Sequence, residues 1–213
     1  MASPSLGHRH GATKALDVLR WCREMNVQYV TVFAASIDNL TKRDKEEIAA
    51  LMNLIEEFVA ERLAQQDARL HLAGRLELIP ASTAQIIRDA IAISTTFSSD
   101  QHLTAALGYD GRTEILDAAR AYLRRREAEG ATIDEVIDTI TPDDIAAHLY
   151  TNHQPHPELV IRTSGEARLS TFMPWQTAYS HLYFCAAPWP ALRRRDIRRA
   201  VRRYAADLPT HVG

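Results

Sequence analysis

The sequence predicts an α/β fold with a mostly parallel central sheet flanked by helices, in a single domain of residues 1–213. Short apolar runs of β-branched residues alternate along the chain with longer segments whose apolar residues recur at helical spacing. That alternation is typical of a parallel sheet whose strands are connected through helices. The 46% hydrophobic and 24% charged residues are ordinary for one globular domain of this length. No internal repeat and no low-complexity linker divides the chain.

The elements are predicted from the period of the apolar residues and from the residues that end each segment. Ala15, Leu19 and Cys22 are spaced three or four residues apart, which predicts one apolar face of a helix. The apolar run Val27–Phe33 predicts a buried strand. Pro80 closes a short strand, and the helix after it begins near a serine cap. The predicted helices cover residues 12–25, 44–64, 83–93, 113–127, 133–139, 142–149 and 193–206, and the predicted strands cover 27–33, 76–79, 102–107, 159–162 and 182–185.

Charge and cysteine content exclude several classes of protein. A net charge of −2 argues against a general nucleic-acid-binding protein. Cys22 and Cys185 lie far apart in apolar surroundings, which favours buried, reduced thiols over a disulfide or a metal site. No apolar run reaches the length of a membrane span, and no signal peptide is visible, so we expect a cytoplasmic protein.

The most informative segment is the loop that follows the predicted strand over residues 159–162. Arg162, Gly165, Arg168 and Ser170 lie within nine residues of one another. Ligands of open α/β sheets bind beyond the carboxyl ends of the strands, and arginine forks bind phosphate oxygens in pairs. The loop therefore predicts an anion site, with a solvated loop of surface arginines as the alternative.

The segment from Glu158 to Phe184 also resembles a known family signature. Its spacing I-R-T-S-G-E-x-R-L-S, followed by F-x-x-W-Q-x-x-Y-S-x-L-Y-F, resembles that of the cis-prenyltransferases, the undecaprenyl diphosphate synthase family. Residues 7–11 (GHRHG), 36–40 (SIDNL) and 108–112 (GYDGR) are similar to further motifs of that family, in the same order. Short-chain Z-type farnesyl diphosphate synthases look most similar, and the resemblance covers about residues 7 to 206.

The resemblance implies an enzyme of isoprenoid biosynthesis that binds isopentenyl diphosphate and an allylic diphosphate and transfers the prenyl group. It implies Mg²⁺ as the cofactor and a dimer as the assembly. The substrate tail would lie in an apolar tunnel formed in part by one face of the predicted helix over residues 44–64. That face includes Leu51, Leu54, Ile55 and Phe58, which serve equally well as core residues.

The resemblance also assigns roles to single residues. Arg162, Arg168, Ser170 and the Gly165 turn between them would bind the diphosphate of isopentenyl diphosphate. The residues expected beside the allylic diphosphate or on the proton-transfer path are His8, Ser36, Asn39 and Lys42.

Three features depart from the family pattern. The chain lacks the strand and D-G-N-x-R-W segment with which the family begins, and it also lacks the arginine-containing tail with which the family ends. His181 stands where the family has a metal-side glutamate, and imidazole is a poor ligand for Mg²⁺. Both carboxylates directed at Mg²⁺ are therefore missing, although the arginines of the isopentenyl site are present.

These departures leave three hypotheses open. A wrongly assigned start of the sequence would account for the missing first segment, but it would not account for His181. Alternatively, the chain is a non-catalytic or regulatory subunit that pairs with a complete homologue. The third possibility is a diverged coupling or cyclisation reaction with His181 as a proton-transfer group, since a histidine titrates near neutrality. The aromatic stretch from Phe172 to Phe184 fits either an interface between subunits or ordinary core.

Overall fold

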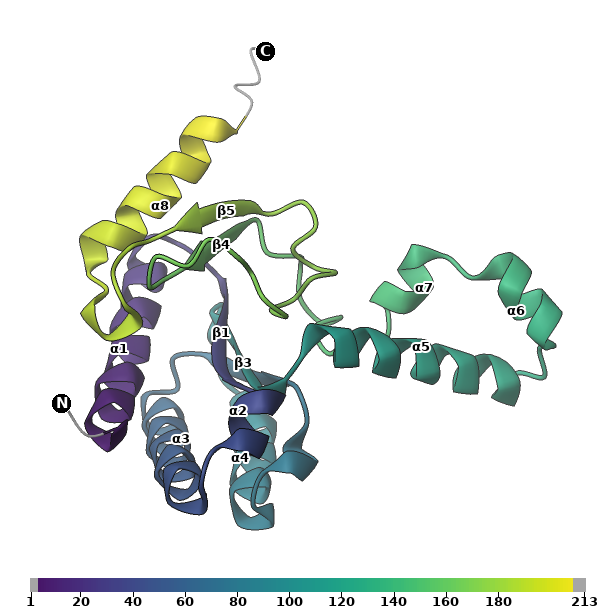
Figure 1. The fold of residues 1–213 in the computed structure, drawn as a ribbon, viewed down its shortest axis with the longest axis horizontal. Coiled ribbons are helices and arrows are strands. Elements are labelled where there is room, and N and C mark those ends of the chain that lie inside the picture. Colours follow the sequence, from purple (N-terminus) through teal and green to yellow (C-terminus); the bar gives the residue numbers. More distant parts are fainter. Residues whose placement is uncertain (1–3, 209–213) are drawn as a thin grey trace.

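The computed structural model describes the backbone of residues 4–208 and the side chains of residues 14–208. It is an α/β structure in which all strand pairs are parallel (Figure 1). The helices are α1 Pro4–Glu24, α2 Ile37–Lys42, α3 Lys45–Gln65, α4 Ala81–Ser94, α5 Gly111–Ala128, α6 Ile133–Thr139, α7 Pro142–Ala146 and α8 Arg194–Asp207. The strands are β1 Tyr29–Ser36, β2 Arg69–Ala73, β3 His102–Tyr109, β4 Leu159–Arg162 and β5 His181–Phe184, and two 3₁₀ turns, η1 Leu76–Leu78 and η2 Trp189–Ala191, complete the chain.

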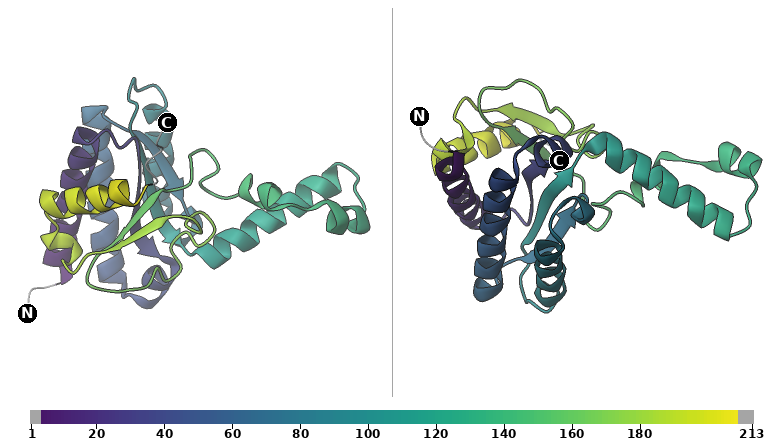
Figure 2. Two further views of the ribbon diagram at one scale, coloured as in Figure 1. Left: turned by 90° about the horizontal axis from the view of Figure 1, so that it is seen from above. Right: turned by 60° about the horizontal axis from the view of Figure 1, so that its bottom comes forward.

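The predicted fold class is confirmed, but the strands form two sheets. One sheet has the order β1-β3-β2, and the other pairs β4 with β5. In the first sheet Val30 lies opposite Leu103 and Leu70 lies on the other side of Leu103. In the second, Leu159 pairs with His181 and Arg162 with Phe184. Helices α3 and α4 pack together below the three-stranded sheet, and α1 and α8 lie beside β4 and β5 (Figures 1 and 2).

Two predictions about strands are wrong. Residues 76–79 form the 3₁₀ turn η1 rather than a strand, because Gly74 (φ +132°) and Pro80 confine this segment between a turn and a helix. The strand in this part of the chain is β2. Its apolar residues alternate with Arg69 and His71, so the sequence shows no continuous apolar run there. The strand β1 is not buried as predicted: Val30, Thr31 and Val32 are half-buried and Tyr29 is exposed.

An arm formed by α5, α6 and α7 projects from the body of the molecule (Figure 1). Its small core of Ala118, Ile145 and Leu149 contacts Trp175. Side chains of the arm that remain exposed and apolar are Leu116, Leu123, Ile133, Ile137 and Ile140.

Three histidines stack on one another beside the first sheet. The His71 ring lies 4.1 Å from the His153 ring and 5.2 Å from the His102 ring, and His71 Nε2 is 3.0 Å from His102 Nδ1. Burial first, and then the charges of His153, His102 and Arg69, together lower the pKa of His71 to about 4. Burial also lowers the pKa of His102 and of His153. The folded state therefore favours the neutral form of all three rings.

We expect the free energy of unfolding to fall as the pH decreases from 6.5 towards 4. In that window the unfolded chain binds more protons at these histidines than the folded chain does, so acid favours unfolding. Solvent screening limits the effect to the order of 1 kcal/mol for the half-exposed His71. Urea midpoints of the wild type and His71→Phe measure it, with the exposed His156→Gln as control. Equal pH dependence in all three proteins would contradict the expectation.

Candidate functional site

The arginine loop begins where β4 ends and turns sharply at two residues. Ser164 and Gly165 both have φ of +69°. The Ser164 N–H donates to the Ala187 carbonyl at 2.9 Å, and the Gly165 N–H donates to the Cys185 carbonyl at 3.0 Å. The loop is therefore held against the segment after β5. Because its N–H is already engaged, Gly165 contributes the turn rather than a donor in this conformation.

Both loop arginines converge on one carboxylate. Glu166 Oε2 lies 2.9 Å from Arg168 Nη2 and 3.9 Å from Arg162 Nη2. Arg162 Nε is buried and has no hydrogen-bond partner among the described residues. Two guanidinium groups around one carboxylate form a site that an anion of higher charge can occupy. Ser170, with φ of +55° and an exposed side chain, follows in the same loop.

Ser36, Asn39 and Lys42 lie at the end of β1 and in the short helix α2 that follows it. The Ser36 hydroxyl accepts from the Asn39 N–H at 2.9 Å, and Asn39 Oδ1 accepts from the Ser36 N–H at 3.3 Å, so the two residues cap α2. Lys42 Nζ lies 2.6 Å from Asp38 Oδ2, and both side chains are exposed. His8 lies in α1, but its side chain is outside the described residues.

His181 lies away from the arginine loop. It begins β5 opposite Leu159, whereas Arg162 pairs with Phe184 at the far end of the same two strands. Three residues of strand separate the two ends by about 10 Å. The His181 ring packs edge-on against the Tyr204 ring at 5.2 Å, and the Tyr204 hydroxyl donates to Glu158. The structure therefore does not bring His181 together with the arginines.

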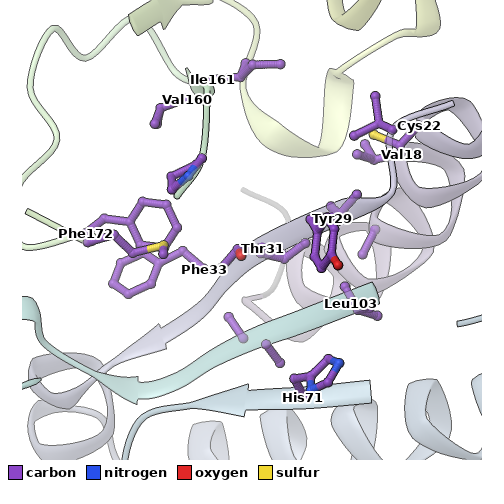
Figure 3. Close-up of a pocket in the computed structure, with 18 of the residues that line it drawn as sticks. Val18, Cys22, Tyr29, Thr31, Phe33, His71, Leu103, Val160, Ile161 and Phe172 are labelled. Carbon is purple, nitrogen blue, oxygen red and sulfur yellow. The ribbon is translucent and has the colours of Figure 1, made fainter. Parts of the chain in front are cut away.

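A large cavity of about 930 Å³ lies next to the loop, between β1 and β4 (Figure 3). All four predicted tunnel residues, Leu51, Leu54, Ile55 and Phe58, line it, together with other apolar side chains of α1, β1, β4 and α8. Arg162 and Thr163 form part of its boundary. Pockets of this volume typically bind small molecules. The arrangement can hold an anionic group at the arginines and an apolar chain beside them.

Two polar clusters near β3, one buried and one half-buried, were not predicted as functional. Glu114 is fully buried and accepts hydrogen bonds from the Tyr109 hydroxyl, the Tyr150 N–H at 2.9 Å and the Gln176 amide at 3.1 Å. Burial, and then the Glu114 carboxylate, raise the pKa of Tyr109. The signal in the sequence was the resemblance of residues 108–112, with Glu114 two residues further on, to a family motif, which assigned no role to the glutamate.

The second cluster joins the loop after β2 to α5. Arg75 donates to Asp117 through Nε at 3.0 Å and Nη2 at 2.6 Å, and the Tyr150 hydroxyl donates to Asp117 at 2.5 Å. Burial, and then the bond to Asp117, raise the pKa of Tyr150 to about 12. Burial opposes the ionisation of Asp117, but the bonds from Arg75 and Tyr150 outweigh it and lower the pKa of this carboxyl. The cluster fixes α5 and the carboxyl end of β2 relative to each other.

The carboxylates near these strand ends do not fit a Mg²⁺ site built by the protein alone. Asp38 is paired with Lys42, Glu166 with the arginines, and Asp110 accepts from the Thr113 N–H at 2.9 Å as the cap of α5. Residues 14–208 contain no group of three or more side chains arranged to hold a metal. The roles proposed below therefore rest on the arginines and the cavity.

The fold and this site define a class: an α/β protein with an arginine anion site at the end of a parallel strand, next to an apolar cavity. The sequence model described as "Putative undecaprenyl diphosphate synthase" matches residues 1–208, and the chain belongs to this family, the cis-prenyltransferases. It is a prenyltransferase, as the resemblance implied. No helix among the described residues is long and apolar enough to cross a membrane.

Similar proteins agree with this assignment. An isoprenyl transferase of Streptomyces fradiae is 47% identical over 209 residues, which are 97% of this chain and 81% of the relative. A (2Z,6E)-farnesyl diphosphate synthase of Mycobacterium tuberculosis H37Rv is 45% identical over 203 residues, or 95% of this chain and 77% of the relative. The crystal structure of lavandulyl diphosphate synthase from Lavandula x intermedia in complex with dimethylallyl diphosphate superposes with a TM-score of 0.86 at 27% identity, covering 95% of this chain and 86% of that chain.

Proposed function

We propose that the chain is a short-chain isoprenyl diphosphate synthase that forms the new double bond in the cis configuration. The observation that carries the proposal is that Arg162 belongs to both the anion site and the wall of the apolar cavity. Isopentenyl diphosphate held by the arginines would have its reactive alkene next to the cavity, in which the tail of the allylic substrate would lie. The relatives named as farnesyl diphosphate synthases support the short-chain assignment.

In the proposed reaction, the bond between the allylic carbon and its diphosphate breaks as the alkene of isopentenyl diphosphate attacks that carbon. A proton is then lost from the condensation product, and a new double bond forms. Arg162, Arg168 and Ser170 would hold the isopentenyl diphosphate. Ser36 and Asn39 would lie on the allylic and proton-transfer side, and the cavity would exclude water from the cation-like transition state.

His8 and Lys42 are proposed to contact the allylic diphosphate, and His181 remains a candidate for proton transfer only if a neighbouring subunit brings substrate to it. Mg²⁺ is the metal that the family generally uses, and here the diphosphate oxygens would have to supply most of its ligands.

Turnover by the purified chain tests the proposal directly. With isopentenyl diphosphate, an allylic diphosphate and Mg²⁺, we expect a short isoprenyl diphosphate to form. No turnover alone, followed by activity in a stable complex with a complete homologue, would instead identify the non-catalytic partner subunit.

Glu166 is expected to compete with the substrate for the arginines. Replacing Glu166 with Gln removes the negative charge that now lies 2.9 Å from Arg168, so pyrophosphate should bind about threefold to tenfold more tightly. Calorimetric titration with pyrophosphate measures the change, and the exposed Glu57→Gln on α3 serves as the control. Weaker binding by Glu166→Gln would show that this carboxylate supports the site rather than blocks it.

We also propose that the chain is a dimer, either with itself or with a complete homologue. The aromatic stretch contributes exposed side chains at Tyr179 and Phe184, but Met173 is buried core. The arm offers a larger apolar face, in which Ile133 and Ile137 lie on the same side of α6 with 65% of each side chain exposed. Light scattering should show a dimer that Ile137→Glu weakens, whereas Glu127→Gln on the same arm should leave it intact. A monomeric wild type would contradict the proposal.

A further inference from the structure

The helix α8 concentrates positive charge on a chain that is negative overall. Its 14 residues include six arginines and two aspartates, a net charge of +4, whereas the whole chain has −2. Four of these arginines recur three or four residues apart and so lie on one side of the helix. All four are exposed and together line a hollow of about 250 Å³. This arginine face consists of Arg195, Arg198, Arg199 and Arg202.

The arginine face has no acidic partner within the described part of the chain. Residues 14–208 supply no ion pair or hydrogen bond to any of its four guanidinium groups. Two neighbouring arginines of α8 are paired instead: Arg194 Nη2 lies 2.7 Å from Glu24 Oε2, and Arg203 Nε lies 3.1 Å from Asp207 Oδ2. Residues 1–13 and 209–213 contain no aspartate or glutamate. The charge of the arginine face is therefore not neutralised by any described carboxylate.

This arrangement has a cost that an external anion would relieve. Like charges three or four residues apart on a helix repel one another, and solvated helices commonly mix both signs on their exposed side. The arginine face contains four such pairs, all positive. Several negative charges placed over the face would remove this repulsion and interact with all four guanidinium groups.

The shape of the arginine face indicates an extended anionic surface. From Arg195 to Arg202 the helix rises by about 10 Å, so the guanidinium groups form a row along a convex helix. A row of this length matches several phosphate groups side by side better than one diphosphate. The helix α8 lies on the outside of the molecule, at the opposite end from the arm (Figures 1 and 2). A partner bound to α8 would therefore leave the apolar side of the arm free.

We propose that the arginine face docks this protein on the surface of a membrane that contains anionic phospholipids. The attraction is electrostatic and acts at the headgroups, because the four positions carry no apolar side chain that could enter the acyl layer. Nucleic acid matches the face less well. Single strands stack on aromatic side chains, and the aromatic residue of α8, Tyr204, is engaged with His181 and Glu158.

Docking through α8 would place the membrane beside one wall of the apolar cavity. The inner side of the helix contributes Ile197, Val201 and Tyr204 to the lining of that cavity. The consequence for catalysis rests on the proposed function: a product with an isoprenyl tail would be released close to the bilayer, into which apolar chains partition.

Sedimentation of the whole chain with sucrose-loaded vesicles tests the proposal. Vesicles of equal parts phosphatidylcholine and phosphatidylglycerol are compared with vesicles of phosphatidylcholine alone. We expect the wild type to bind the anionic vesicles at least about tenfold more tightly, and the difference to shrink as salt is added. Arg198→Gln combined with Arg202→Gln should weaken this binding about tenfold or more. The charge-conserving Arg198→Lys with Arg202→Lys should retain it, because a membrane surface needs the charge but not the guanidinium fork.

The matched control is Arg88→Gln combined with Arg124→Gln, which changes two exposed arginines of α4 and α5. It removes the same charge from the protein but not from α8, so it should bind the vesicles as the wild type does. Arginine and glutamine have similar helix propensities, so all these variants should fold.

A loss confined to the glutamine variant of α8 supports membrane docking. No preference of the wild type for anionic vesicles overturns the proposal, and so does equal binding by the two glutamine variants. Tighter binding to a DNA duplex than to the anionic vesicles also overturns it. Release from the vesicles by pyrophosphate, but not by sodium chloride of equal ionic strength, would show a discrete phosphate site instead of a membrane surface. Because these measurements contain no isoprenyl substrate, their outcome is independent of the proposed function.

Discussion

Replacing Arg162 or Arg168 with Ala should weaken diphosphate binding by at least about 1.5 kcal/mol each, a loss of about tenfold or more in affinity. Each guanidinium offers charge-assisted bonds to a ligand that carries two or more negative charges. Arg162 should show the larger loss, because its Nε is buried without a partner among the described residues and Arg168 is 72% exposed. Calorimetry with isopentenyl diphosphate and with pyrophosphate measures both variants.

The matched control for these variants is Arg198→Ala on α8, an exposed arginine far along the chain from the loop. It removes the same charge from the protein but should leave the affinity unchanged. If both loop variants bind pyrophosphate as tightly as the wild type does, the arginine loop is not the diphosphate site.

The second large effect is expected at Glu114, whose replacement by Leu should lower the free energy of unfolding by about 3–5 kcal/mol. The carboxylate accepts hydrogen bonds from Tyr109, Tyr150 and Gln176, and these buried donors would lose their partner together. Urea denaturation measures the change as a shift of the midpoint at constant slope.

Glu57→Leu is the control for this substitution, because Glu57 is an exposed residue on α3. We expect it to change stability by no more than about 0.5 kcal/mol. Similar urea midpoints for the Glu114 and Glu57 variants would mean that the buried network does not support the fold.

The sequence predicted the parts of this protein that depend on local patterns. The arginine loop was found because Arg162, Gly165 and Arg168 follow a short apolar strand within seven residues, and the structure places both arginines around Glu166. The helical stripe at Leu51 and Phe58 predicted tunnel residues that do line the cavity. Both features arise from neighbours in sequence.

What could not be predicted depends on contacts between distant residues. The strands β1 and β4 are more than 120 residues apart in the chain, and no local pattern shows that both line the same cavity. Glu114 acquires its three donors from residues before and after α5, so its buried role is a property of the assembled fold. The separation of His181 from Arg162 follows from strand register, which the short segments leave undefined.

A crystal structure of the chain with a non-reactive thiolo analogue of isopentenyl diphosphate tests the central claim most directly. The account predicts that the diphosphate displaces Glu166 and lies within hydrogen-bond distance of Arg162 and Arg168. Its isopentenyl group should point into the cavity that Leu54 and Phe58 help to line. A diphosphate bound elsewhere, such as on the arginine-rich face of α8, or a tail directed away from the cavity, would contradict it.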